Sequence, residues 1–287
     1  MNVQPPKDPR ELLKHFSQTY FSLRMGLAVL AFAFPLVLYV YGKLRHGLDL
    51  QPSMSAYFWA AGAVEQCASF PMRTLFVGFL FAIGVGLYLY KGITTLENYL
   101  LNAAGICAAL VAIYPERLTH AEALTDERVA ALFKMCPAIH AWAAAPPWPV
   151  HYIAAITLFM LLAVVAWFCA SKTLDYLPVG QDAAKYRRLY RLVAIGMVVF
   201  PIPGFLAALL LGKATHWVFF VEAAGIVTFG IYWAIKSREL SLSQLETNPA
   251  DAAAHAIQRR AAPAADGTPP GIGGRRGGAG IAASQKL

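Results

Sequence analysis

The stretch RTLFVGFLFAIGVGLYLYKG, from Arg73 to Gly92, decides the fold class. The 17 residues between Arg73 and Lys91 carry no charge. A helix rises about 1.5 Å per residue, so these residues cover roughly 26 Å, close to the ~30 Å hydrocarbon core of a bilayer. Tyr90 and Lys91 at one end and Arg73 at the other are typical membrane-surface anchors. The stretch therefore predicts a transmembrane helix.

One face of this helix carries small residues only. Gly78, Ala82 and Gly86 are spaced four apart, so they lie above one another on a helix. Helices in lipid are not drawn together by the hydrophobic effect, and a stripe of small residues lets two backbones approach closely. We expect this stripe to be a helix-packing surface.

Composition extends this interpretation to the whole chain. Of 287 residues, 58% are hydrophobic and only 14% are charged, whereas soluble domains carry about 25% charged residues. The net charge of +8 comes from basic residues scattered at the ends of apolar runs. That distribution is typical of membrane topology signals, so we expect the lipid bilayer as the partner and no nucleic acid.

Six apolar runs are long enough to cross a bilayer, which predicts an all-α, polytopic integral membrane protein with a six-helix bundle. The expected spans are residues 25–42, 74–90, 98–115, 151–171, 192–212 and 215–235, within a transmembrane domain of residues 23–238. A polar segment, residues 1–22, precedes this domain. Residues 239–287 are expected to follow it as a cytoplasmic, largely disordered tail, which is rich in Ala, Pro, Gly and Arg from about Asn248. Two long loops lie at 47–72 and 115–149.

Basic residues predict the orientation of the bundle. With the N-terminus inside, the cytoplasmic segments hold 17 lysines and arginines and the opposite side holds 7. The positive-inside rule therefore places both termini in the cytoplasm and both long loops outside.

The two loops each contain one cysteine, Cys67 and Cys136. Loop cysteines on an oxidising side of a membrane are commonly paired, which favours a disulfide between the loops. The alternative is two unrelated thiols. The chain has no CxxC or Cys/His spacing of the kind that binds metal, so no metal site is expected.

Glu222 is the sharpest functional candidate because it lies within the last apolar run, in WVFFVEAAGIV. An ionised carboxylate in hydrocarbon costs several kcal/mol unless it is paired or protonated, so Glu222 should face the bundle interior. The expected topology brings further polar residues to the same outer level: Arg73, His151, His216, Ser53, Ser55 and Tyr57. One interpretation is a polar pocket open to the outer side. The other is that Arg73 and His151 are surface anchors and Glu222 makes a structural pair.

These residues also carry a resemblance. The pattern Ser53-x-Ser55-x-Tyr57, then Arg73-x-x-Phe76-Val77-Gly78 and Tyr90-Lys91-Gly92, resembles a group of bacterial multi-spanning membrane proteins of unknown function. Phe58, where a second tyrosine is usual, Thr74, where Asn or Asp is usual, and longer outer loops depart from that pattern. The resemblance covers about residues 50–238 and implies a location in the bacterial inner membrane.

A fainter similarity is to the superfamily of alkaline ceramidases and adiponectin receptors. Those proteins are seven-span hydrolases with zinc held by three histidines, whereas this chain has six apolar runs and no HxxxH motif. The leading hypothesis is an outward-facing pocket that binds or transports a small molecule, lipid or proton. A membrane-embedded metal-dependent lipid hydrolase and a structural or accessory subunit remain alternatives. No catalytic residue or cofactor is assigned, and the substrate and oligomeric state stay open.

Overall fold

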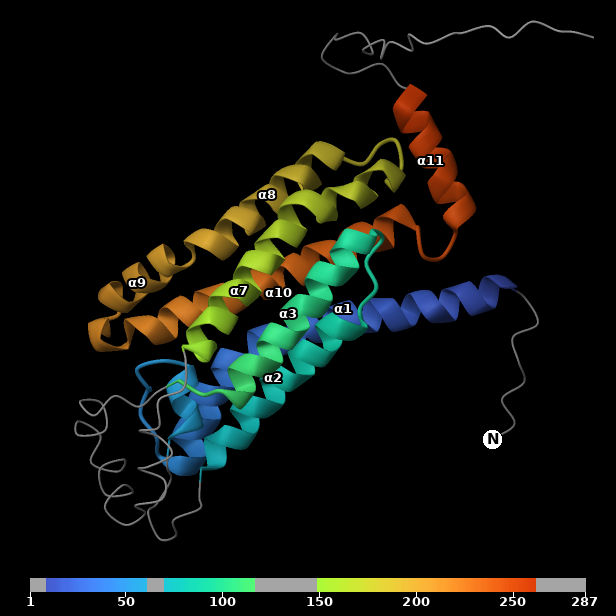
Figure 1. The fold of residues 1–287 in the computed structure, drawn as a ribbon. Helices are drawn as coiled ribbons and strands as arrows, with labels where there is room; N and C mark the ends of the chain where they lie inside the picture. Colours follow the sequence, from blue (N-terminus) through green and yellow to red (C-terminus); the bar gives the residue numbers. More distant parts are fainter. Residues whose placement is uncertain (1–8, 61–69, 117–148, 262–287) are drawn as a thin grey trace, which may run out of the picture.

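The computed structural model describes residues 9–60, 70–116 and 149–261, and these form helices, turns and irregular segments without a β-strand. Figure 1 shows the long helices lying side by side in one bundle. They are α1 (Pro9–His46), α2 (Pro71–Leu89), α3 (Thr95–Ile113), α7 (Val150–Val164), α8 (Ala183–Val199) and α10 (Trp217–Ser243). The all-α class expected from the sequence is confirmed.

Five helices in the described part of the chain are long and apolar enough to cross a membrane, as judged by length and composition. One is continuous from Val150 to Tyr176, because α7 runs on through η2 (Val165–Cys169) and η3 (Ala170–Tyr176). A sixth span requires α8 and α9 (Pro201–Leu210), which are bent by 67° relative to each other, to cross together. Pro201 and Pro203 at this bend lack the N–H that would continue the α8 hydrogen bonds. The helices indicate a membrane-spanning protein, while the count of six stays a prediction.

The bundle has two distinct ends, visible in Figure 1. The short helix η1 (Ser55–Phe58) lies at one of them, called here the η1 end, and α11 (Pro249–Ala261) lies at the other, the α11 end. Helices α1, α3 and α8 run from the α11 end to the η1 end, and α2, α7 and α10 run back. The described chain therefore enters and leaves the bundle at the same end.

Helix α1 begins earlier than the sequence indicated. It contains 38 residues, about 57 Å at 1.5 Å per residue, so it is much longer than a bilayer core. Residues 9–22, expected to belong to a separate polar segment, are the first turns of this helix. They project from the bundle with Leu12, Leu13, Phe16 and Phe21 exposed.

The tight contact between α2 and α3 runs through other glycines than expected. A Cβ at Gly84 would lie 2.9 Å from the Gly105 carbonyl oxygen, and a Cβ at Gly105 would lie 2.5 Å from that of Gly84. Gly86 packs on Leu27 of α1, and a Cβ at Gly86 would lie 2.7 Å from the leucine Cδ2. Gly78 and Ala82 are exposed, so the expected stripe is corrected to the contacts of Gly84, Gly86 and Gly105.

The segment after the bundle is helical where disorder was expected. Helix α10 continues to Ser243, and α11 then packs against the turn between η3 and α8. The Arg259 guanidinium fixes this turn by donating to three backbone carbonyls, those of Leu177 at 2.7 Å, Pro178 at 2.6 Å and Gln181 at 2.7 Å. The expected tail boundary at residue 239 is therefore too early. Residues 262–287 lie outside the described part of the chain.

The expected disulfide cannot be placed in this fold. Cys67 and Cys136 both lie outside the described residues, so their pairing stays a prediction. The two cysteines in the described part, Cys107 and Cys169, are free thiols within helices.

Candidate functional site

A serine, a histidine and a glutamate from three separate elements meet at the η1 end. Ser55 Oγ of η1 lies 3.0 Å from His151 Nε2 at the start of α7 and 3.0 Å from Glu222 Oε1 on α10. The segment before η1 is fastened to α10, because the Phe219 N–H donates to the Pro52 carbonyl at 3.0 Å. Because its hydroxyl lies within hydrogen-bond distance of both His151 and Glu222, Ser55 bridges these two side chains. We refer to these three residues as the outer triad.

The second carboxylate oxygen of Glu222 is held by backbone. Glu222 Oε2 accepts from the Met54 N–H at 2.6 Å and more distantly from the Ser55 N–H at 3.4 Å. Backbone N–H groups can only donate a hydrogen bond, so this oxygen must act as the acceptor for both. Any proton carried by Glu222 within this geometry therefore lies on Oε1, the oxygen that faces Ser55.

The other ring nitrogen of His151 fixes its tautomer. Nδ1 lies 2.8 Å from the Tyr114 carbonyl oxygen, which can only accept a hydrogen bond. Nδ1 must therefore carry a proton, and in the neutral imidazole Nε2 is then an acceptor that faces Ser55.

With both Ser55 contacts as hydrogen bonds, the outer triad requires one more proton than a neutral histidine and an ionised glutamate supply. The chain from Glu222 Oε1 through Ser55 Oγ to His151 Nε2 contains two hydrogen bonds and needs two protons. The Ser55 hydroxyl supplies only one. The second belongs either to a protonated Glu222 or to a doubly protonated His151, and in both arrangements the three side chains together are neutral.

A further acidic residue, Glu116, supports the triad from outside. Its carboxylate accepts from the Ser53 hydroxyl and from the Tyr152 hydroxyl at 3.0 Å, and its backbone carbonyl accepts from Trp59 Nε1 at 2.8 Å. Ser53 in turn accepts from the Ala56 N–H at 2.9 Å, which closes the turn that carries Ser55. No sequence signal pointed to this role, because Glu116 looked like the polar end of an apolar run.

A cavity of about 80 Å³ lies beside the triad. Ser55, His151 and Glu222 form its polar part, and Met54 lies next to them. The rest of its wall is apolar and comes from α1, α2, α3, α7 and α10: Phe34, Phe76, Leu80, Val111, Ala155, Leu158, Phe159 and Ile226. The three polar groups of the triad thus converge on a small, otherwise apolar space.

Arg73 does not belong to this group, contrary to the expected pocket. Its guanidinium carbon lies 4.3 Å from the Phe58 ring centroid and 4.2 Å from that of Phe70, and Nε approaches the Phe58 carbonyl at 3.5 Å. Such contacts are cation–π interactions. Arg73 therefore anchors η1 to the start of α2 through these rings.

His216 and Tyr57, also expected in the pocket, make their contacts outside the outer triad. His216 bonds to the neighbouring Thr215 hydroxyl at 2.8 Å in the short turn before α10. Tyr57 is fully buried, with its ring 6.2 Å from that of Phe219. Burial raises the pKa of Tyr57 to about 12, so its hydroxyl stays neutral.

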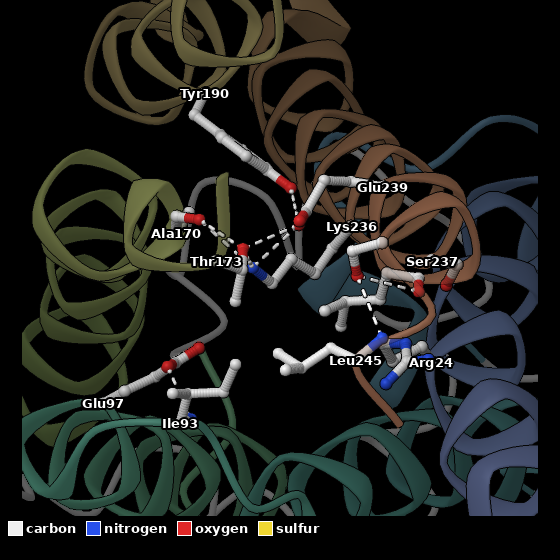
Figure 2. Close-up of polar contacts among 12 residues, drawn as sticks. Arg24, Ile93, Glu97, Ala170, Thr173, Tyr190, Lys236, Ser237, Glu239 and Leu245 are labelled. Atoms are coloured by element: carbon white, nitrogen blue, oxygen red, sulfur yellow. Dashed lines mark hydrogen bonds and ion pairs between the residues drawn. The ribbon is translucent and has the colours of Figure 1, made fainter. Parts of the chain in front are cut away.

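A second polar cluster lies deep at the α11 end (Figure 2). Lys236 Nζ lies 3.1 Å from Glu239 Oε2, 2.6 Å from Thr173 Oγ1 and 3.1 Å from the Ala170 carbonyl. Glu239 Oε2 also accepts from Tyr190 at 3.0 Å and from Thr173 at 2.8 Å. Lys236 and Glu239 are at most 1% exposed. We call Lys236 and Glu239 the inner pair.

Two more buried charges flank the inner pair, and neither was expected. Arg24 of α1, 1% exposed, forms a two-pronged ion pair with Glu246 at 2.6 and 2.9 Å. Glu97, 2% exposed, accepts from the Ile93 N–H at 3.1 Å, while Thr94 accepts from the Glu97 N–H. These reciprocal bonds resemble a capping box at the start of α3.

The described residues contain no group of three or more His, Cys, Asp or Glu side chains placed to hold a metal ion. No family model, curated protein or solved structure matches the chain. A function must therefore be argued from the geometry of the two clusters.

Proposed function

We propose that the protein binds or transports a small molecule at the outer triad and couples this to the movement of one proton. The observation that carries the proposal is the proton count: a neutral, hydrogen-bonded chain in which one proton has two alternative positions. The cavity beside the chain provides the space where a ligand would meet it.

The proton moves by two linked transfers. Glu222 Oε1 gives its proton to Ser55 Oγ while Ser55 gives its own to His151 Nε2, so Glu222 becomes a carboxylate and His151 an imidazolium. The serine is unchanged at the end. A polar ligand group that bonds better to one of these two states shifts the proton toward it, because a ligand moves an equilibrium by its difference in affinity for the two states.

The proposed setting is a bacterial inner membrane with both termini in the cytoplasm. Under the positive-inside rule the basic residues favour the α11 end as the cytoplasmic one. The η1 end, with the outer triad and its cavity, would then face the outer side. A small molecule or proton would reach Glu222 from outside the cell.

A serine hydrolase is the second candidate, because Ser55 Oγ and His151 Nε2 are within hydrogen-bond distance. Acyl transfer also needs N–H donors for the oxyanion. The N–H groups nearest Ser55 are occupied: Met54 and Ser55 donate to Glu222, and Ala56 donates to Ser53. The geometry therefore favours proton exchange over acyl transfer.

Infrared difference spectroscopy across a pH titration tests the proposal on protein in lipid nanodiscs. The wild type should show one titrating carboxyl or imidazolium signal that is absent from Glu222→Gln, since the amide replaces the protonated carboxyl without a removable proton. Asp49→Asn is the matched control, because it alters an exposed carboxylate at the same end, paired with Lys43, and should keep the signal.

Identical titration spectra for the wild type and Glu222→Gln would overturn the proposal and favour a structural role for the triad. A covalent adduct of Ser55 with an activated-serine probe, lost in His151→Phe, would instead favour the hydrolase.

A further inference from the structure

A groove of about 330 Å³ runs along the outside of the bundle between α7–η2 and α8, and its lining does not include the outer triad. Its floor is formed by the buried Ala163 and Ala194 with Val164. Its walls are large, exposed apolar side chains: Met160, Trp167, Phe168, Ile195, Val198 and Val199. Figure 1 shows α7 and α8 lying alongside each other over this length.

The groove owes its shape to an irregular turn. The Ala170 N–H bonds to the Val165 carbonyl, five residues back, so η2 is a π-helical turn within an otherwise continuous helix. Such a turn inserts an extra residue and is frequent at functional sites. Here it directs Trp167 and Phe168 outward to form one wall.

The end of the groove nearer the α11 end is positively charged. Arg191 precedes Ala194 and Ile195 by three and four residues. It therefore lies on the same face of α8 as the groove, one helical turn nearer the α11 end. Its guanidinium carbon lies 6.0 Å from the Trp167 ring centroid. Arg187 and Arg188 lie one turn further toward the α11 end. In the described part of the chain, no carboxylate forms an ion pair with these three arginines.

We propose that this groove binds one anionic phospholipid, with an acyl chain along the apolar walls and the phosphate at Arg191. An apolar channel that ends in arginines, with which no carboxylate of the described residues forms an ion pair, matches both halves of such a molecule. Arginine binds phosphate oxygens through paired N–H donors. A basic residue near a membrane surface contributes about 1 kcal/mol toward anionic lipid. The proposal does not depend on the function assigned to the outer triad.

Native mass spectrometry of the full chain in mild detergent tests this, with phosphatidylglycerol and phosphatidylcholine of the same acyl chains as probes. We expect retained phosphatidylglycerol in preference to phosphatidylcholine, and about fivefold weaker phosphatidylglycerol binding in Arg191→Gln, which corresponds to the loss of one such charge. Arg191→Lys should lose less. Lys91→Gln, which removes an exposed charge at the same end, is the matched control and should bind normally.

Val198→Trp tests the apolar half of the site, because Val198 is 51% exposed and a larger ring there fills the groove from outside the core. It should weaken both lipids while leaving the melting temperature unchanged. Equal phosphatidylglycerol binding in the wild type, Arg191→Gln and Val198→Trp would overturn the proposal. Displacement of the lipid by millimolar inorganic phosphate alone, or a second copy of the chain in the groove, would overturn it as well.

Discussion

Helix α10 carries two inward-facing carboxylates with opposite surroundings. Glu222 and Glu239 are 17 residues apart, or about 26 Å along the helix axis. Glu239 is 0% exposed and lies 3.1 Å from Lys236, with a tyrosine and a threonine on the same oxygen. Glu222 is only partly buried, lines a cavity, and forms no ion pair with a lysine or arginine among the described residues.

The difference shows two ways of keeping a carboxylate inside an apolar bundle. At Glu239 a fixed cation compensates the charge, and the site is closed. At Glu222 hydrogen bonds from Ser55 and two backbone N–H groups surround the carboxylate, the proposed shared proton would compensate its charge, and the site is open to a cavity. A fixed ion pair favours a structural role, whereas a shared proton beside a cavity permits exchange. Substitutions at the two sites and between them test this contrast, in order of expected effect.

Breaking the inner pair should have the largest effect. Lys236→Met leaves Glu239 buried without its cation, and removing one partner of a buried pair typically destabilises a protein by about 3–5 kcal/mol. The double variant Lys236→Met/Glu239→Leu removes both charges and should recover most of that loss. Unfolding in mixed micelles followed by tryptophan fluorescence measures both. A double variant as unstable as the single one would contradict the assignment of a simple ion pair.

A packing change between the two regions should have the next largest effect. Gly105→Ala places a Cβ 2.5 Å from the Gly84 carbonyl oxygen. Backbone atoms cannot move aside as a side chain can, so a loss near the upper end of the usual range, about 3 kcal/mol, is expected. Gly78→Ala is the matched control, since a Cβ there meets nothing within 4 Å. Equal effects of the two substitutions on the melting temperature would contradict the α2–α3 contact.

At the outer triad, a substitution that removes the hydrogen-bonding groups of Glu222 should destabilise the protein more than one that removes only its charge. Glu222→Gln keeps an acceptor for the Met54 N–H and a donor for Ser55, so its stability should stay within about 1 kcal/mol of the wild type. Glu222→Ala leaves these groups unpaired, and an unpaired buried polar group costs about 1–3 kcal/mol. Thermal unfolding at neutral pH compares the two. A Gln variant as unstable as the Ala variant would mean that Glu222 is held as an ion.

The sequence predicted the parts of this molecule that depend on local composition. Apolar runs without charge located helices that are long and apolar enough to cross a membrane, and the cost of a charge in lipid placed Glu222 inward. His151 was expected near Glu222 because it opens a predicted span, and Ser55 because it lies just ahead of another. Each of these inferences needs only one segment and its relation to a membrane.

Contacts between distant segments were not predictable in the same way. Arg24 and Glu246 are 222 positions apart, and each alone looks like a residue at the surface of a span. Lys236 looks like the end of the last span, because the sequence does not show that α10 continues to Ser243. Arg73 was expected at the same level as Glu222, but its guanidinium lies against the rings of Phe58 and Phe70.

The smallest effect at neutral pH is expected for a residue that positions the triad without joining it. Tyr57 lies two residues after Ser55, and its ring packs on Gly42 of α1, where a Cβ would lie 3.3 Å from Cε1. Burial raises its pKa to about 12, against about 10 in an unfolded chain. Between these values the unfolded state loses the proton while the folded state keeps it, so stability falls as pH rises through this window.

Tyr57→Phe has no proton to lose, so it should match the wild type near neutral pH and become the more stable of the two above about pH 10. Tyr190→Phe is the contrasting variant, because Tyr190 donates to Glu239 at 3.0 Å and its loss should already lower the melting temperature at neutral pH. Melting temperatures of the three proteins at neutral and alkaline pH decide the matter. If Tyr57→Phe follows the wild type throughout, η1 does not bury this ring, and the position of Ser55 between His151 and Glu222 loses its support.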